Sequence, residues 1–483
     1  MKETIRIILI GVGPHSKRVY LPAVADLKKK YPVEISLAVD VRAEASNVEH
    51  HFEKNGYQIN TLFIDPFSNE LPVDLRNTLT GFVADNKVNA AIIATEPTVH
   101  HAYAEWALEL GLHILMDKPV STRDNAISDF SQAKGILDDY LHLLDMYNKL
   151  QQRTSTAFTV NVQRRYHPGF QLAMERIREV ALVTNCPVTC IQSTHCDGQW
   201  RLPSEIVTQD YHPYNRGFGK ISHSGYHIFD IVSQLFKAPG ISSKQPDAME
   251  VMSSMVQPRG FIKQLPESDY AGYFEAAYGN IKAHSDAELW EIYKDYGEMD
   301  AAIIVRMLKE QENIANITIN LLHNSFARRN WILPGSDLYK GNGRVKHEYH
   351  HIQQGPFQNI QIHSYQAKDK HQHNSAEDYK VGGNNHFDIY IFRNIGVLGG
   401  EHPLEVINMK DIAQKHHLDD SKLLTEQSKT AVVKEFLDFI MGNTPKEKLT
   451  SNIDTHLDSV KMMAASYMSH VQRKEKDNPV IGL

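Results

Sequence analysis

Three side chains in this sequence could handle a proton and a developing negative charge. Lys118 stands at the end of a short apolar run, directly before Pro119. His227 and Asp230 lie three positions apart in a stretch with helical periodicity, so both can face one site. An imidazole can accept a proton, a nearby carboxylate can orient that imidazole, and an ammonium can stabilise an alkoxide. The first turn of a helix disfavours an imidazolium, so a helix that begins near Ser222 would keep His227 neutral.

The elements around Lys118 are expected to form one strand–helix–strand crossover. The chain runs from an apolar strand that ends at Thr95, through a helical pattern at 99–110, to a second strand that ends at Lys118. Ligands of an open parallel sheet bind beyond the carboxyl ends of its strands. Thr95 and Lys118 both occupy such ends, and Pro119 restricts the backbone beside the lysine.

A glycine-rich turn near the start of the chain predicts a dinucleotide site. The apolar strand at 5–10 leads into Gly11 and Gly13 and then into a helix that extends to about Lys30. The first glycine permits a tight turn, the second lets a pyrophosphate approach the backbone, and the helix N-terminus attracts negative charge. Ser16 stands at the position of the third glycine in the GxGxxG pattern.

The next strand, at 33–39, ends in an acid that could select the cofactor. The carboxylate of Asp40 can accept hydrogen bonds from a ribose diol, which favours NAD. Arg42 lies two residues further on and is compatible with NADP. Asp40 could also be an ordinary turn acid, but the glycine turn that precedes it favours the cofactor role.

The order of these fragments resembles the Gfo/Idh/MocA family of oxidoreductases, which includes glucose–fructose oxidoreductase and inositol dehydrogenase. The resemblance rests on Thr-x-Pro-x-x-His at 95–100, Asp-Lys-Pro at 117–119 and Gly-x-His-x-x-Asp at 225–230. The usual tripeptide in the family is Glu-Lys-Pro, so Asp117 departs from it. His223 is a second departure, because many members carry an acid four residues before the histidine.

The resemblance implies an NAD(P)-dependent enzyme that moves a hydride between nicotinamide and a carbinol carbon of a sugar, sugar derivative or cyclitol. It implies that Lys118, His227 and Asp230 are catalytic, and that Arg165 and His223 contact the substrate. The cofactor would be bound by Gly11, Gly13, Pro14, His15, Asp40, Arg42, Thr95, Pro97, His100, Asp117 and Lys118.

Several of these residues have ordinary alternatives. His227 could be a capped surface histidine, and His100, like its neighbour His101, could simply occupy the polar first turn of a helix. Arg164 and Arg165 stand where the chain leaves the first domain, so they could form interdomain ion pairs instead of facing a cleft.

Two other functions are compatible with the same scaffold. Some relatives are regulators that bind cofactor and ligand without turnover, although the presence of Lys118 and His227 argues against this reading. Other relatives use bound NAD for redox-assisted glycoside cleavage, but this sequence lacks the glycine–histidine-rich segment of those members.

Composition excludes several classes of protein. The chain has 483 residues, of which 42% are hydrophobic, enough for two or three domains with sizeable cores. The net charge is −7 and no lysine–arginine block occurs, so a nucleic-acid partner is not expected. No apolar run reaches membrane-spanning length, and residues 5–10 lack a signal-peptide pattern. We expect a cytoplasmic homodimer or homotetramer that acts on a small molecule.

The cysteines and histidines give no sign of a catalytic metal. Cys186, Cys190 and Cys196 form no CxxC pair, and their odd number argues against a disulfide framework, which favours a reducing compartment. Histidines are frequent, for example His371 and His373, but no HExxH or similar ligand spacing occurs. No metal is therefore expected.

The fold class is α/β. Residues 1–162 are expected to form a Rossmann domain with a doubly wound parallel sheet, and residues 163–483 a substrate-binding and oligomerisation domain with insertions. The resemblance implies an open, mostly antiparallel sheet in this second domain. Two helical stripes at 430–441 and 457–471 are expected to pack near the junction.

The second domain is expected to contain a set of short strands. We interpret the stretch 197–220 as a loop and 244–299 as a polar insertion. Apolar runs predict strands at 188–194, 302–307, 314–321, 329–333, 360–365 and 388–392.

Overall fold

The computed structural model describes residues 4–333, 343–368, 377–419 and 422–483, so His371 and His373 lie outside the described residues. The chain divides into two compact units, each assembled from separate stretches of sequence. Unit 1 comprises Met1–Arg123, Gly135–His167 and Leu424–Val460, and unit 2 comprises Asp124–Lys134, Pro168–Leu423 and Lys461–Leu483. The sequence predicts a single boundary after residue 162. The structure differs from this division in that residues 424–460 return to unit 1.

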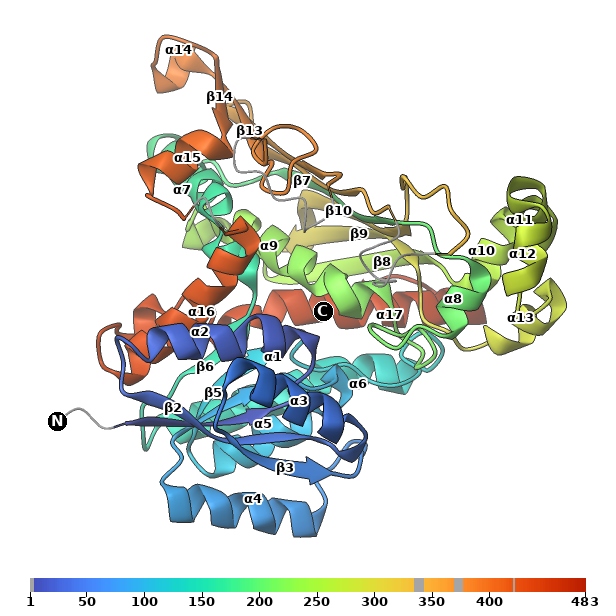
Figure 1. Cartoon of the computed structure of the whole chain (residues 1–483). Helices are drawn as coiled ribbons and strands as arrows, with labels where there is room; N and C mark the ends of the chain where they lie inside the picture. The colour runs from blue at the N-terminus through green and yellow to red at the C-terminus, as the bar shows by residue number, and fades with distance from the viewer. Residues whose placement is uncertain (1–3, 334–342, 369–376, 420–421) are drawn as a thin grey trace. The chain divides into compact units, whose positions relative to one another are not determined.

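Unit 1 contains a six-stranded parallel sheet in the order β3-β2-β1-β4-β5-β6, and helices cover both of its faces (Figure 1). Its apolar runs are buried on both sides, as parallel sheets require. This arrangement confirms the predicted doubly wound Rossmann sheet. The strands are β1 (Ile5–Ile10), β2 (Val33–Val41), β3 (Asn60–Ile64), β4 (Ala90–Ile93), β5 (His113–Asp117) and β6 (Phe158–Asn161).

The helices of unit 1 include one from the far end of the chain. Helix α16 contacts α2 in the same hydrophobic core, and the Tyr31 hydroxyl donates to Asp438 at 2.7 Å. The helix expected from the glycine turn to Lys30 is broken at Val19 into α1 and α2. The helices are α1 (Pro14–Arg18), α2 (Tyr20–Leu27), α3 (Ala45–Asn55), α4 (Val73–Asn86), α5 (His100–Glu109), α6 (Phe130–Gln151) and α16 (Leu424–Ile440).

Unit 2 is built on a nine-stranded sheet in the order β14-β13-β12-β11-β7-β10-β9-β8-β15 among the described residues. Of the strand pairs in this sheet that the structure describes, only β7 and β10 are parallel, which confirms an open, mostly antiparallel sheet. The strands are β7 (Cys190–Gln199), β8 (Ala248–Val256), β9 (Asp300–Lys309), β10 (Glu312–Asn324), β11 (Lys346–Gln354), β12 (Gln358–Gln366), β13 (Asp388–Arg393), β14 (Leu404–Asn408) and β15 (Ile481–Gly482).

Helices α9 and α17 contact this sheet. On the α17 side, the Ser253 hydroxyl of β8 donates to the Ser466 carbonyl at 2.6 Å, and the Ser469 hydroxyl accepts from the Ser253 N–H at 2.8 Å. The helices are α7 (Pro168–Thr184), α8 (Pro203–Val207), α9 (Tyr226–Lys237), α10 (Pro258–Gln264), α11 (Glu267–Phe274), α12 (Ala276–Ile281), α13 (Asp286–Ile292), α14 (Ile395–Leu398), α15 (Met409–Lys415) and α17 (Leu457–Glu475), most of which lies in unit 2. Every helix within the described ranges is too short or too polar to cross a bilayer.

Three expectations for unit 2 were wrong. The stretch 244–299 is not only an insertion, because it contains the sheet strand β8. The stretch 197–220 contains the end of β7 and the helix α8. Residues 329–333 form no strand; the Arg329 guanidinium instead makes two hydrogen bonds, of 2.6 and 2.7 Å, to the Glu205 carboxylate.

Strand β11 was missed because its inward-facing residues include polar ones. Glu348, His350 and Gln354 alternate into the interior, where an apolar pattern would be expected. His350 is satisfied within the sheet: its two ring nitrogens lie 2.9 Å from the Ser193 hydroxyl of β7 and 2.9 Å from the Glu348 carboxylate. A buried polar network of this kind gives a strand without a hydrophobic signature.

His113 makes the stability of unit 1 depend on pH. Its Nδ1 accepts a hydrogen bond from the Ala157 N–H at 3.2 Å, and burial lowers its pKa from 6.5 to about 4. The unfolded chain therefore binds a proton more readily, so stability falls as pH drops from about 6.5 towards 4. The shift predicts a loss of about 2 kcal/mol between pH 7 and pH 5.

Replacing His113 with glutamine should flatten this dependence. We expect the slope of unfolding free energy against pH between 7 and 5 to decrease in His113→Gln, as measured by urea denaturation. His50 on α3 is exposed, so His50→Gln should keep the wild-type slope. An unchanged slope in His113→Gln would show that His113 is not protonated on unfolding in this range.

Candidate active site

The turn after β1 requires glycine at its first position. Gly11 has a φ of +92°, and its N–H donates to the Val39 carbonyl at 2.8 Å. A Cβ at Gly11 would lie 2.5 Å from the Ala94 carbonyl oxygen and 2.8 Å from the Thr95 nitrogen. The turn is therefore packed between the ends of β2 and β4, where a side chain cannot fit.

The second glycine leaves open space above the turn. A Cβ at Gly13 would meet nothing within 4 Å, so a phosphate could approach the backbone there. Ser16 is buried, and its hydroxyl donates to the Gly11 carbonyl at 2.6 Å, which closes the turn in place of the third glycine. These features fit the pyrophosphate of a dinucleotide.

A pair of alanine variants separates these two roles. We expect Gly11→Ala to lower unfolding free energy by about 1–3 kcal/mol, because it adds backbone strain and overpacking. Gly13→Ala should unfold like the wild type but bind dinucleotide at least about tenfold more weakly, since its Cβ would fill the approach path. Thermal unfolding and NADH fluorescence titration measure the two effects. Equal behaviour of the two variants would contradict this assignment.

Asp40 lies at the end of β2, beside the glycine turn. Its two oxygens accept hydrogen bonds from the Val12 N–H at 2.8 Å and from the Val41 N–H at 2.7 Å. Burial raises the pKa of Asp40, and these bonds partly oppose that rise. Each oxygen keeps a second acceptor direction that a ribose hydroxyl could use. Arg42 instead pairs with Asp65 at 3.3 Å, and both side chains are largely exposed, so this pair contributes little.

Asp117, at the end of β5, is the centre of a polar cluster. Its Oδ1 accepts from the Tyr20 hydroxyl at 2.6 Å and from the Asn161 amide at 3.2 Å, and lies 3.6 Å from His15 Nε2. Burial alone would raise the pKa of Asp117, but His15, Tyr20 and Lys118 outweigh it and lower the pKa. Burial also lowers the pKa of His15 to about 4.

Tyr20 and Asn161 were not predicted from the sequence. Asn161 is the last residue of β6, so the strand-end rule that singled out Thr95 and Lys118 would also have found it. Tyr20 had no comparable signal. It lies on the second helix after the turn, and its role depends on the break at Val19.

Lys118 follows Asp117 directly and is partly exposed at the carboxyl end of the sheet. The loop that carries it is held by His100, whose Nδ1 lies 2.8 Å from the Pro119 carbonyl and whose Nε2 lies 3.1 Å from the Thr95 carbonyl. His100 is fully buried, and burial lowers its pKa. It therefore links the loops that carry Thr95 and Lys118. Pro97 begins the short 3₁₀ turn before α5.

Arg165 is held inside unit 1 by the segment that follows α16. Its guanidinium donates to the Thr450 carbonyl at 2.9 Å and to the Thr455 hydroxyl at 2.6 Å, and the side chain is buried. These bonds give Arg165 a structural role within unit 1. Neither of the two roles expected from the sequence, a position facing the cleft or an interdomain ion pair, includes these bonds. Its contact with substrate stays a prediction.

In unit 2, His227 and Asp230 lie on α9, as predicted, with Asp230 buried and His227 half-buried. The helical run begins close to Ser222, as expected, and its π-helical turn, Ile221–Gly225, leads directly into α9, so His227 lies beyond the first turn of the run. The prediction that His227 occupies the first turn was therefore wrong. Since the helix-terminus effect fades within one turn, it gives His227 no support for the neutral state.

His223 lies in the π-helical turn and is packed among aromatic rings. It stacks on His212 with centroids 4.7 Å apart, and the rings of Tyr214 and Phe218 meet it edge-on at 5.6 Å each. These three partners come from the stretch 197–220. His223 therefore belongs to an aromatic cluster.

A buried charge cluster around Asp197 was missed by sequence reasoning. Asp197 Oδ2 lies 2.5 Å from the Lys220 ammonium, and Asp197 Oδ1 accepts from Arg344 at 3.0 Å. Burial would raise the pKa of Asp197, but Lys220, His323 and Arg344 outweigh it and hold the pKa well below its usual range. Lys220 starts the helical run three residues before His223, so this cluster anchors that end of the helix.

Comparison with known families finds a match for the N-terminal part of the chain. Residues 5–137 match the family model GFO_IDH_MocA, described as an oxidoreductase family with an NAD-binding Rossmann fold. The matched part of the chain, residues 5–137, is thus similar to the Rossmann domain of this family. The match confirms an NAD-binding oxidoreductase, as the motifs predicted. No curated protein matches the chain in a sequence search.

Solved structures match almost the whole chain in fold. An oxidoreductase from Agrobacterium radiobacter, in complex with NAD+, L-tartaric acid and magnesium, is 11% identical with a TM-score of 0.58, covering 99% of this chain and 98% of its own. WlbA dehydrogenase from Bordetella pertussis, in complex with NADH and UDP-GlcNAcA, is 12% identical with a TM-score of 0.57, covering 100% and 98%. Levoglucosan dehydrogenase, in complex with NADH and levoglucosan, is 12% identical with a TM-score of 0.57, covering 100% and 99%.

Proposed function

We propose that this enzyme transfers a hydride between nicotinamide and a carbinol carbon of a sugar, a sugar derivative or a cyclitol. The observation that carries the proposal is the position of Lys118 at the carboxyl end of β5, in the same unit as the Gly11–Gly13 turn. The substrate class follows two relatives of the same fold, which bind UDP-GlcNAcA and levoglucosan.

The side chains of this protein would manage the proton and the charge of that reaction. Bound NAD(P) supplies the hydride acceptor or donor at its nicotinamide ring. Lys118 donates a hydrogen bond to the carbinol oxygen and stabilises its charge when the alcohol is deprotonated. His227 accepts the proton during oxidation and returns it during reduction, while Asp230, on the same helix, orients the His227 ring.

The cofactor and substrate contacts extend this proposal. Asp40 would accept hydrogen bonds from the adenosine ribose diol, and its charge would repel the 2′-phosphate of NADP, so we expect NAD to bind more tightly. His223 would contact the substrate from its aromatic cluster. Arg165 would also contact the substrate, from the turn in which its guanidinium binds Thr450 and Thr455.

The test is a panel of sugars, sugar acids and polyols, assayed by nicotinamide absorbance with NAD and with NADP. The proposal predicts substrate-dependent reduction of NAD by at least one of these compounds. Dinucleotide binding without any absorbance change across the panel would favour a sensor. Sugar release without net reduction would favour an NAD-assisted glycosidase.

A further inference from the structure

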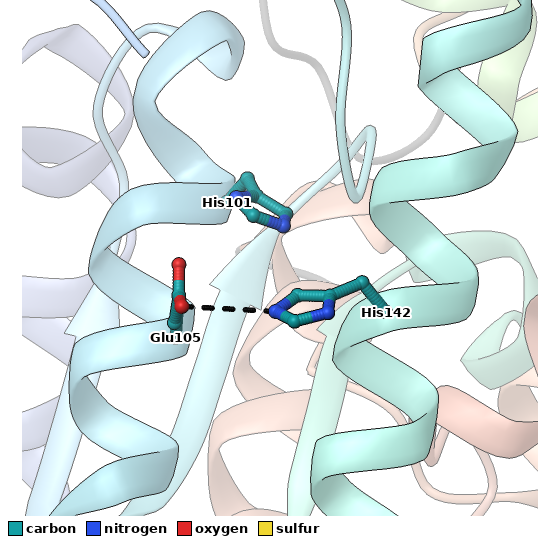
Figure 2. Close-up of side chains that lie close together, drawn as sticks. All are labelled: His101, Glu105 and His142. Carbon is teal, nitrogen blue, oxygen red and sulfur yellow. Dashed lines mark ion pairs between the residues drawn. The ribbon is translucent and has the colours of Figure 1, made fainter. Parts of the chain in front are cut away.

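Three metal-ligating side chains meet between helices α5 and α6 of unit 1, at a place that the proposed reaction does not use. His101 and Glu105 lie at positions i and i+4 of α5, so they share one face of that helix. His142 lies on α6 and faces them. Figure 2 shows the three side chains directed into the same space from the two helices.

The spacing of the ligand atoms is close to that of a metal site. One donor atom from each residue lies within 4.8 Å of the other two, and the His142 Nε2 lies 3.7 Å from a Glu105 oxygen. Ligands at about 2.0–2.1 Å from a tetrahedral ion lie about 3.3 Å apart. Donor atoms at the 4.8 Å limit would therefore need to approach by about 1.5 Å, which partly exposed side chains can do by rotation. His142 is 50% exposed and Glu105 35%.

His101 supplies a second observation that points to a ligand. Its Nε2 is buried and has no hydrogen-bond partner among the described residues, which is costly for a ring nitrogen. A metal ion would satisfy it. The neighbouring charges do not prevent this, because Arg123 and Asp139 are paired, with Arg123 Nε donating to Asp139 at 3.0 Å.

We propose that His101, Glu105 and His142 bind a divalent transition-metal ion, with Zn²⁺ as the ion that best suits the donors. Two imidazoles and one carboxylate are one of the ligand sets that Zn²⁺ takes in three-residue sites, with water at the fourth position. The ion would connect α5 to α6. It would also fix the start of α5, where His100 holds the loops of Thr95 and Lys118.

The experiment uses the full chain after treatment with a chelator and measures carbethoxylation of individual histidines by peptide mass spectrometry. One equivalent of Zn²⁺ should slow the modification of His142 at least about fivefold. His402 is exposed in unit 2 and serves as an internal control whose rate should not change. In Glu105→Gln, which keeps the size of the side chain, protection of His142 should require at least about tenfold more Zn²⁺.

A second measurement guards against variants that simply unfold. Without metal, Glu105→Gln and His142→Asn should melt at the wild-type temperature, because both side chains are partly exposed. Added Zn²⁺ should raise the melting temperature of the wild type and not of these variants. Equal protection of His142 in wild type and Glu105→Gln, or no protection at all, would overturn the proposal, and neither result would bear on hydride transfer.

Discussion

Replacing Lys118 with alanine is expected to lower turnover about 10²–10³-fold, the usual effect of removing one donor to a developing oxyanion. The ammonium would otherwise stabilise the carbinol oxygen as it loses its proton. Dinucleotide binding should change little, because the glycine turn and Asp40 do not involve the ammonium. Steady-state kinetics measure the first effect and NADH fluorescence titration the second.

The matched control is Lys54→Ala on the exposed end of α3, which removes the same charge away from the carboxyl edge of the sheet. Turnover should stay at the wild-type level in that variant. If Lys118→Ala turns over as fast as Lys54→Ala, Lys118 has no role in the chemistry. If it loses dinucleotide affinity to the same extent as turnover, Lys118 belongs to cofactor binding alone.

Lys220→Met is expected to lower the free energy of unfolding by about 3–5 kcal/mol. The substitution leaves Asp197 as a buried carboxylate without its closest cation, and breaking one half of a buried pair costs about this much. Arg344, also bonded to Asp197, would compensate only in part. Urea denaturation followed by fluorescence measures the change.

The double variant Asp197→Asn plus Lys220→Met is the control for this effect. It removes both charges, so it should recover a large part of the stability that Lys220→Met loses. A double variant as unstable as the sum of the two single variants would show that Asp197 and Lys220 are not coupled, contrary to the 2.5 Å contact between them.

The Rossmann unit could be predicted because its signals are local. Apolar runs at 5–10 and 33–39, with Gly11 between them, require a strand, a turn and a second strand before any long-range contact is known. The carboxyl-end rule then placed Thr95 and Lys118 at one edge of the sheet. Applied to every strand, it would also have found Asn161.

The remaining features of the fold and the site could not be predicted, because they depend on contacts that no local pattern encodes. The polar residues of β11 look like a loop until His350 meets Ser193 from another strand. The charges of Asp197 and Lys220 look solvated until folding buries them together. His227 lies outside the first helical turn, because a π-helical turn precedes α9. The first two errors arose where buried polar groups are satisfied by partners distant in sequence.

The most direct measurement uses a substrate from the panel with deuterium at the carbinol carbon. Incubation with NAD and the enzyme, followed by mass spectrometry of the dinucleotide, reports where the label goes. Hydride transfer predicts one deuterium on the nicotinamide ring for each substrate molecule oxidised. Deuterium that remains on the substrate or is lost to water, with the dinucleotide unlabelled, would contradict the proposed reaction.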